Sequence, residues 1–364
     1  DEVTPESVRQ AALRSMEQGE TFYSHNLGLP ELRQAIAAYT HQLHPQSRVE
    51  LERIAVTSGG VSALMVAFQT LVDAGDEVLL VTPVWPNLLY QPALLGAVVR
   101  TVTLKSQNCL ADGTVGGTWQ LDLEELLEAI TPATKVLVLN SPNNPSGWTL
   151  SRVEQEAILA RCRETGTWVL TDEVYERLYF DPSPNGCAPS FLDIATDEDR
   201  VVVAHSFSKS FLMTGWRLGW LVLPKRLSEA VGKVIEFNTS CAPVFVQRAG
   251  LAALAQADQI VPGVQAHLRG CRDRLVDQLQ RLPKVQVSPA PGGLYAFFRL
   301  EGETDSLALA KRLVREAHLG LAPGSAFFPV SQPESEAWLR WCFASKDLNR
   351  LDAGVQRLQD WLGL

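Results

Sequence analysis

Short apolar runs rich in β-branched residues recur along the first part of the chain, and helix-like stretches separate them. The runs are RIAVT (53–57), DEVLLVT (76–82), KVLVLN (135–140), TWVLTD (167–172) and RVVVAHS (200–206). The helix-like stretches include VSALMVAFQTLVDAG (61–75) and LDLEELLEAI (121–130). Continuous apolar strands that alternate with helices are typical of a parallel sheet buried on both faces. The sequence therefore predicts an α/β fold with a mainly parallel sheet flanked by helices.

The pattern changes after about Leu254. A long polar helix, QAHLRGCRDRLVDQLQRL (265–282), precedes short strands within VQVSPAPGGLYAFFRL (285–300) and two further helices. This order predicts a smaller α+β domain. Since 364 residues are enough for two domains, we predict a large domain over residues 1–254 and a small C-terminal domain over residues 255–364.

Composition and charge exclude several classes of protein. The chain has 32 basic and 41 acidic residues and a net charge of -9, which argues against a nucleic-acid partner. No apolar run approaches the roughly 20 residues of a membrane span, and no signal-peptide pattern opens the sequence, so we expect no membrane association. The six cysteines lack CxxC spacing, which favours reduced thiols in a cytoplasmic protein and predicts no metal site.

Residues with useful chemistry follow each predicted strand directly. In open α/β sheets, ligands bind at the carboxyl ends of the strands. The residues found there are Gly59 and Gly60, Trp85, Asn143 and Asn144, Asp172 with Tyr175, and Ser206 with Lys209. The glycines open a helix, so their backbone N–H groups can bind an anion. The strand ends therefore predict one site with an anion cradle, an aromatic ring, an amide, a carboxylate with a phenol, and an amine.

The segment SFSKSFLMTGWRLGW (206–220) places Lys209 among small hydroxyl residues and Arg217 within an apolar run. Cations are rarely placed in such surroundings unless they have partners. We therefore predict that this amine and this guanidinium each bind a partner in a partly dry site.

Taken together, these motifs resemble the fold type I aminotransferases of class I/II, which depend on pyridoxal 5′-phosphate (PLP). The resemblance runs from about Thr4 to the C-terminus. It is carried by SFSKSFLMTGWRLGW, NSPNNPSG (140–147), the pair Asp172 and Tyr175, GLPELR (28–33) and RWCFA (340–344). It implies a transaminase that moves an amino group from an L-amino acid to a 2-oxo acid by a ping-pong mechanism. It also implies that residues 1–254 bind the cofactor and that the protein is a homodimer with shared active sites.

The resemblance assigns roles around the cofactor ring. Lys209 forms a Schiff base with the cofactor aldehyde and then moves the substrate Cα proton. Asp172 keeps the pyridine nitrogen protonated, so the ring stays an electron sink. Tyr175 and Asn144 hydrogen-bond the phenolic oxygen. Trp85 stacks on the ring, although a buried tryptophan can equally serve as a core residue.

The resemblance also assigns the phosphate contacts. Backbone N–H groups of Gly60 and Val61 and the side chains of Ser206 and Arg217 are expected to bind it. Tyr23 is expected to reach the phosphate from a second subunit. Close packing between a helix and a strand is the alternative explanation for Gly60.

At the substrate side, Arg340 matches the family arginine that binds the α-carboxylate through a bidentate fork, and Asn144 is expected to contact substrate as well. Since no second cation is assigned to a substrate side chain, we expect a neutral or apolar amino acid to be preferred over aspartate. Gly292 and Gly293 predict a turn that lets a loop approach the cofactor, and His205 is expected to be structural.

Two other functions stay open at this stage. Similar residues support a PLP-dependent β-lyase of the C–S lyase kind, because the protein decides only which bond aligns with the cofactor. The chain could instead be the PLP-binding sensor domain of a transcription regulator whose DNA-binding part is missing. The sequence starts at the helix that follows the family's N-terminal arm, so the arm either lies outside this sequence or is lacking.

Overall fold

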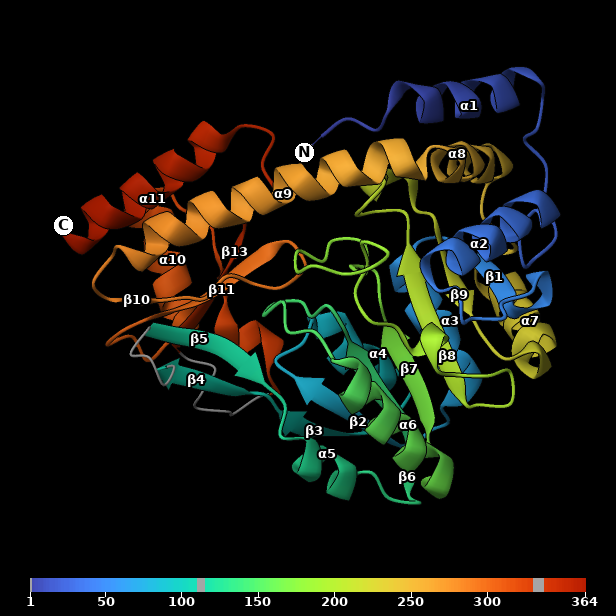
Figure 1. Ribbon diagram of the computed structural model, residues 1–364, viewed down its shortest axis with the longest axis horizontal. Coiled ribbons are helices and arrows are strands. Elements are labelled where there is room, and N and C mark those ends of the chain that lie inside the picture. The colour runs from blue at the N-terminus through green and yellow to red at the C-terminus, as the bar shows by residue number, and fades with distance from the viewer. Residues whose placement is uncertain (1, 110–114, 330–336) are drawn as a thin grey trace.

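The computed structural model describes residues 2–109, 115–329 and 337–364. Its large sheet has seven strands (Figure 1). In sheet order they are β1 (Ile54–Thr57), β9 (Gly219–Val222), β8 (Val201–Ser206), β7 (Trp168–Asp172), β6 (Thr134–Asn140), β2 (Glu77–Thr82) and β3 (Val98–Thr103). Only β9 runs antiparallel to its neighbours among these strands. The prediction of a mainly parallel sheet is confirmed, and the five runs correspond to β1, β2, β6, β7 and β8.

Helices cover both faces of this sheet, and the side chains of β6 show how. Val136 and Val138 point into one apolar cluster, whereas Leu137 and Leu139 point into the other, because successive side chains of a strand alternate between faces. The first cluster includes α3 (Gly60–Leu71), α4 (Pro86–Leu94) and α7 (Ser228–Thr239). The second includes α1 (Glu6–Glu17), α2 (Pro30–Leu43), α5 (Leu123–Ala129), α6 (Arg152–Thr165) and α8 (Val244–Ala255). A sheet buried on both faces explains why its strands are continuously apolar.

A separate antiparallel sheet follows in the C-terminal part, as predicted. Its strands are β10 (Val285–Gln286), β11 (Tyr295–Leu300), β13 (Trp338–Cys342) and β12 (Ala322–Pro323). They share an apolar core with α9 (Ala257–Gln280), α10 (Ser306–Ala317) and α11 (Leu348–Leu362). A hairpin of β4 (Lys105–Cys109) and β5 (Val115–Gln120), which the sequence did not indicate, lies against β10 and β11 (Figure 1).

Helix α9 joins the two parts of the molecule (Figure 1). Its first residues, Ala257 and Val261, pack in the core of the large sheet, and its later residues from Val264 to Leu279 pack in the C-terminal core. The predicted domain boundary between residues 254 and 255 falls just before this helix and stays a prediction. No helix among the described residues is long and apolar enough to cross a membrane.

Candidate active site

A pocket of about 150 Å³ lies at the carboxyl ends of the parallel strands. Nine of its lining residues are predicted site residues: Gly60, Val61, Trp85, Asn144, Asp172, Tyr175, Ser206, Lys209 and Arg217. Five more line it: Leu64, Asn140, Val174, Ser208 and Tyr295. The strand order explains the convergence, since β1, β8, β7 and β6 point in the same direction and end at one edge of the sheet.

One end of the pocket is built for an anion. Helix α3 begins at Gly60 and so presents free backbone N–H groups. Gly59 has a φ of +96°, and a Cβ there would lie 2.6 Å from Nη2 of Arg217. The backbone conformation therefore favours glycine at this position, and any side chain there would also displace the flexible end of Arg217. Arg217 Nη1 donates a hydrogen bond to the carbonyl oxygen of Thr214 at 2.8 Å, which fixes the guanidinium near the helix end.

The buried carboxylate of Asp172 lies in the middle of the pocket lining. Its Oδ1 accepts a hydrogen bond from the backbone N–H of Val174 at 3.3 Å, and no cation of the described chain lies within ion-pair distance of it. Burial raises the pKa of this carboxyl to about 6, while the Val174 N–H and the His205 and Lys209 charges lower it. Since a buried carboxylate without a cationic partner is costly, a protonated ring nitrogen fits this position.

Lys209 follows β8 and contributes the amine. Its Nζ lies 5.6 Å from the centre of the Tyr175 ring. Burial lowers the pKa of this amine, the nearby Arg217 and Arg340 guanidiniums lower it further, and Asp172 acts in the opposite direction. A lowered pKa makes an amine available as nucleophile and base near neutral pH.

Arg340 reaches the site from the C-terminal sheet. It does not line the pocket itself, but its Nη1 donates a hydrogen bond to Oδ1 of Asn144 at 2.8 Å. Its guanidinium carbon lies 4.2 Å from the centre of the Tyr295 ring and 4.7 Å from that of Phe327. Its Nε is buried and has no hydrogen-bond partner among the described residues.

Comparisons with known proteins agree with this geometry. The family described as aminotransferase class I and II matches residues 1–358. This chain belongs to that family. The aspartate aminotransferase of Thermotoga maritima is 32% identical over 360 residues, which cover 99% of this chain and 88% of that protein. The probable N-acetyl-LL-diaminopimelate aminotransferase of Bacillus subtilis is 31% identical over 361 residues, covering 99% and 86%.

Solved structures show the same fold. A mutant aspartate aminotransferase of Thermus thermophilus has a TM-score of 0.87 at 30% identity and covers 99% of this chain and 93% of that one. An Escherichia coli protein with a methionine aminotransferase function has a TM-score of 0.89 at 26% identity, covering 99% and 90%. The protein is therefore a PLP-dependent aminotransferase of fold type I, and the lyase and regulator alternatives are not favoured.

Of the five lining residues that were not predicted, Tyr295 and Asn140 have side chains that contact predicted site residues. The Tyr295 hydroxyl lies 3.3 Å from the Tyr175 hydroxyl. The Asn140 side chain accepts a hydrogen bond from the Asn144 N–H at 2.7 Å and donates one to the Asp172 carbonyl at 3.1 Å. Asn140 could have been found as the last residue of a predicted strand. Tyr295 follows the Gly292–Gly293 turn by two residues, and a Cβ on Gly293 would lie 3.6 Å from the Asn143 carbonyl oxygen. The approach of this turn to the cofactor stays a prediction.

Tyr23 is the one predicted site residue that the structure leaves far from the others. Its side chain is 82% exposed and does not line the pocket of its own chain. The prediction placed Tyr23 in the site of a second subunit. It stays a prediction, since the structure contains one chain.

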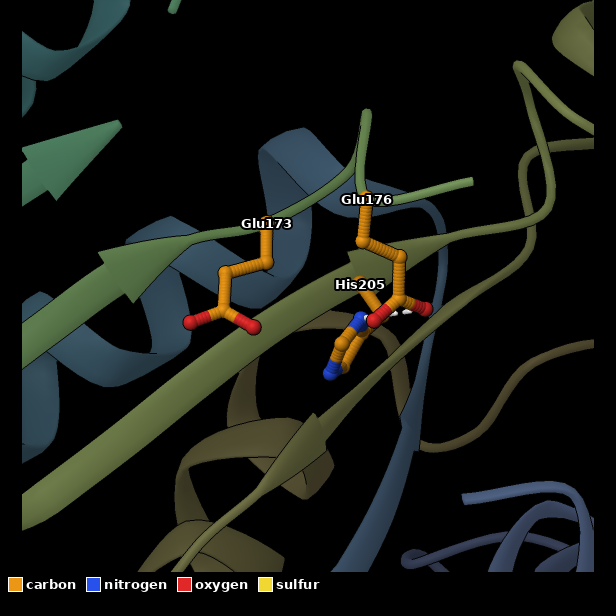
Figure 2. A group of neighbouring side chains, drawn as sticks. All are labelled: Glu173, Glu176 and His205. Carbon is orange, nitrogen blue, oxygen red and sulfur yellow. Dashed lines mark ion pairs between the residues drawn. The ribbon is translucent and has the colours of Figure 1, made fainter. Parts of the chain in front are cut away.

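Glu173, Glu176 and His205 form a buried cluster (Figure 2), in which Glu173 follows the pocket residue Asp172 and His205 precedes the pocket residue Ser206. The possible ligand atoms are within 4.8 Å of one another, a spacing that would suit a metal ion. However, Glu176 lies between His205 Nδ1 at 3.4 Å and His44 Nε2 at 3.3 Å, and Glu173 accepts a hydrogen bond from the Ser190 hydroxyl. These protein partners account for both carboxylates without a metal ion.

The cluster is held by charge pairing. Burial opposes the Glu176 charge, but the two histidines keep the pKa of its carboxyl below the usual range. Burial also opposes charge on His44, yet Asp193 and Glu176 raise its pKa to about 10. His205 stacks on Trp220, with ring centres 4.9 Å apart. These contacts support the structural role expected for His205.

Proposed function

We propose that Lys209 is the amine that binds the cofactor aldehyde and that Asp172 holds the ring nitrogen. The observation that carries this proposal is the convergence of three groups in one pocket. They are a buried amine, a buried carboxylate without a cation among the described residues, and a helix N-terminus with Arg217 beside it. Together they match the aldehyde, ring nitrogen and phosphate of PLP.

When bound, PLP supplies an aldehyde that condenses with amines and a ring that accepts electrons from the substrate Cα. Lys209 Nζ would bind the cofactor aldehyde and would serve as the base that moves the substrate Cα proton. Asp172 would accept a hydrogen bond from the protonated ring nitrogen. Tyr175 would donate a hydrogen bond from its hydroxyl to the phenolic oxygen of the cofactor, which would stabilise negative charge there. Trp85, which precedes α4 and lines the pocket, would cover the ring face.

Arg340 would bind the α-carboxylate of the substrate through its guanidinium fork. Asn144 holds the guanidinium in place through the hydrogen bond at 2.8 Å. Because Arg340 belongs to the C-terminal sheet and Asn144 to a loop of the large sheet, this hydrogen bond already joins the two parts, and a bound carboxylate would hold them together and help to exclude water.

The class of amino acid that acts as donor can be inferred from the cations that are left to bind its side chain. Lys209 and Arg217 are the only lysine and arginine that line the described pocket, and both have roles toward the cofactor. With Arg340 on the α-carboxylate, the described lining of the pocket contains no further cation for the substrate side chain. This supports a neutral or apolar amino acid as donor, even though several relatives are named aspartate aminotransferases.

The working form is proposed to be a homodimer. Tyr23 and Phe237 are both 82% exposed. Their segments lie together, because Asn26 hydrogen-bonds Glu236 and the Ser24 N–H reaches the Cys241 sulfur. Such an exposed aromatic pair favours burial against a second copy. A cytoplasmic location is also proposed, which the free thiols of five described cysteines support.

Absorption spectra and an amino-acid panel test the function. Purified protein with PLP is expected to show a visible band, and a productive donor should convert the cofactor to its amine form, with one 2-oxo acid released per site. Methionine or phenylalanine should convert it faster than aspartate. Lys209→Ala should abolish the conversion, whereas Lys233→Ala, a surface change, should not. Release of ammonia without conversion would contradict transamination.

A further inference from the structure

We propose that Tyr295 is a positioning residue that links the two ends of the site, with its ring holding Arg340 and its hydroxyl orienting Tyr175. This inference rests on the proposed roles of Tyr175 and Arg340. Tyr295 opens β11, whereas Tyr175 follows β7, so the contact joins the C-terminal sheet to the large sheet.

Which of the two hydroxyls donates the hydrogen bond can be deduced by counting their hydrogens. A phenol has one hydrogen to donate. If Tyr175 donates its hydrogen toward the cofactor, its oxygen can only accept from Tyr295, which lies 3.3 Å away. Tyr295 is then the donor, and a donor chain of this kind polarises the Tyr175 O–H group. Tyr175 is buried and Tyr295 is half-buried, and this burial raises the pKa of each phenol.

The ring contact follows from strand register. In the antiparallel pair of β11 and β13, Phe297 lies opposite Arg340. Tyr295 is two residues before Phe297, on the same face and diagonal to Arg340, which is within reach of an aromatic side chain. The guanidinium carbon lies 4.2 Å from the ring centre, a close cation–π distance. With Phe327 at 4.7 Å, the guanidinium has aromatic contacts in addition to its bond to Asn144.

The two contacts can be separated by two substitutions. Tyr295→Phe keeps the ring and removes the hydroxyl. It should weaken Tyr175 as a donor, so the pH midpoint of the bound cofactor's visible band should rise by about 0.5 unit. The KM for a productive amino acid should change less than about twofold. Tyr295→Leu removes the ring as well, and should raise that KM about fivefold but leave the KM for the corresponding neutral amine unchanged.

Controls distinguish this inference from the proposed function. Tyr90→Phe, at an exposed position, should match the native protein in both measurements. Tyr175→Phe should raise the midpoint by more than Tyr295→Phe, and the double variant should add nothing further. If Tyr175→Phe leaves the midpoint unchanged, the proposed role of Tyr175 fails. If Tyr175→Phe moves it and Tyr295→Phe does not, only the inference about Tyr295 is overturned. If Tyr295→Leu raises the KM equally for the amino acid and for the amine, the inference is also overturned. If Tyr295→Leu does not fold, the midpoint of Tyr295→Phe still tests the role of the hydroxyl.

Discussion

The cofactor side and the substrate side of this site are built in different ways. On the cofactor side, Asp172 and Ser206 are the last residues of β7 and β8, and Gly60 begins the helix after β1. On the substrate side, Arg340 lies in the middle of β13 and reaches the pocket through contacts with Asn144 and Tyr295. The first set is fixed by its own strands, whereas the second depends on contacts between two sheets.

This difference has a functional consequence. Groups fixed at strand ends should control how tightly the cofactor is bound and how its ring is charged. Groups held between the two sheets should control which substrates are accepted, since they are placed only when the two parts meet. Substitutions on the two sides should therefore change different measured quantities.

The largest effect is expected for Asp172→Asn on the cofactor side. An amide cannot hold the ring nitrogen in its charged form, so kcat should fall about 10³-fold. PLP affinity, measured by equilibrium titration, should fall as well. Asp199→Asn is a matched control, since Asp199 is also buried but pairs with Arg163, and neither residue lines the pocket. An Asp172→Asn enzyme with native kcat would remove Asp172 from its role.

Two arginine substitutions, one on each side, should separate the cofactor side from the substrate side most clearly. Arg340→Leu should lower kcat/KM about 100-fold for an amino acid and much less for a neutral amine, because only the first has an α-carboxylate. Arg217→Gln should instead weaken PLP binding about 10-fold and leave the preference between these substrates unchanged. If both variants lose PLP affinity and kcat/KM for the amino acid by the same factors, the two sides of the site do not act separately.

The pH dependence of cofactor binding should reflect Asp172. Its pKa is raised to about 6 by burial, so the carboxylate is charged above that pH and becomes neutral as the pH falls through it. PLP affinity of the apoprotein should therefore fall below about pH 6, approaching tenfold per unit. Because the pKa of Asp172 is raised in the folded chain, its protonation stabilises the fold. Below about pH 6 the protein therefore loses PLP affinity without losing stability through this group. If the PLP affinity of Asp172→Asn falls below about pH 6 in the same way, this assignment is wrong.

The smallest effect is expected for His44, which is remote from the substrate side. Its folded-state pKa is raised to about 10, so its contribution to stability is present below its unfolded pKa of about 6.5 and is lost as the pH rises toward 10. His44→Gln should lower the Tm by about 5 °C at pH 6.5, with a smaller difference at pH 9.5. His41→Gln, on the exposed face of α2, should change nothing. A pH-independent difference would show that charge pairing with Glu176 and Asp193 is not the cause.

The same contrast explains what could be predicted from the sequence. Apolar runs mark strands, and the residue after a strand falls at a known edge of the sheet, so Lys209, Asp172 and Trp85 were found together. Strand β9, the hairpin of β4 and β5, and Tyr295 were not found. The position of β9 beside β1 and that of Tyr295 beside Arg340 depend on pairings between segments distant in sequence, which no local pattern records. The hairpin was missed for a different reason: β4 (KSQNC) and β5 (VGGTWQ) are neighbours in sequence but lack the continuous apolar run that marks the other strands.

The central claim is that the Lys209 amine carries the cofactor. Borohydride reduction of the PLP-loaded enzyme, followed by trypsin digestion and peptide mass spectrometry, tests it directly. The added cofactor mass is expected on Lys209, which would also block cleavage there and leave residues 201–217 as one peptide. The same mass on any other lysine, with residues 201–217 unmodified, would contradict the claim.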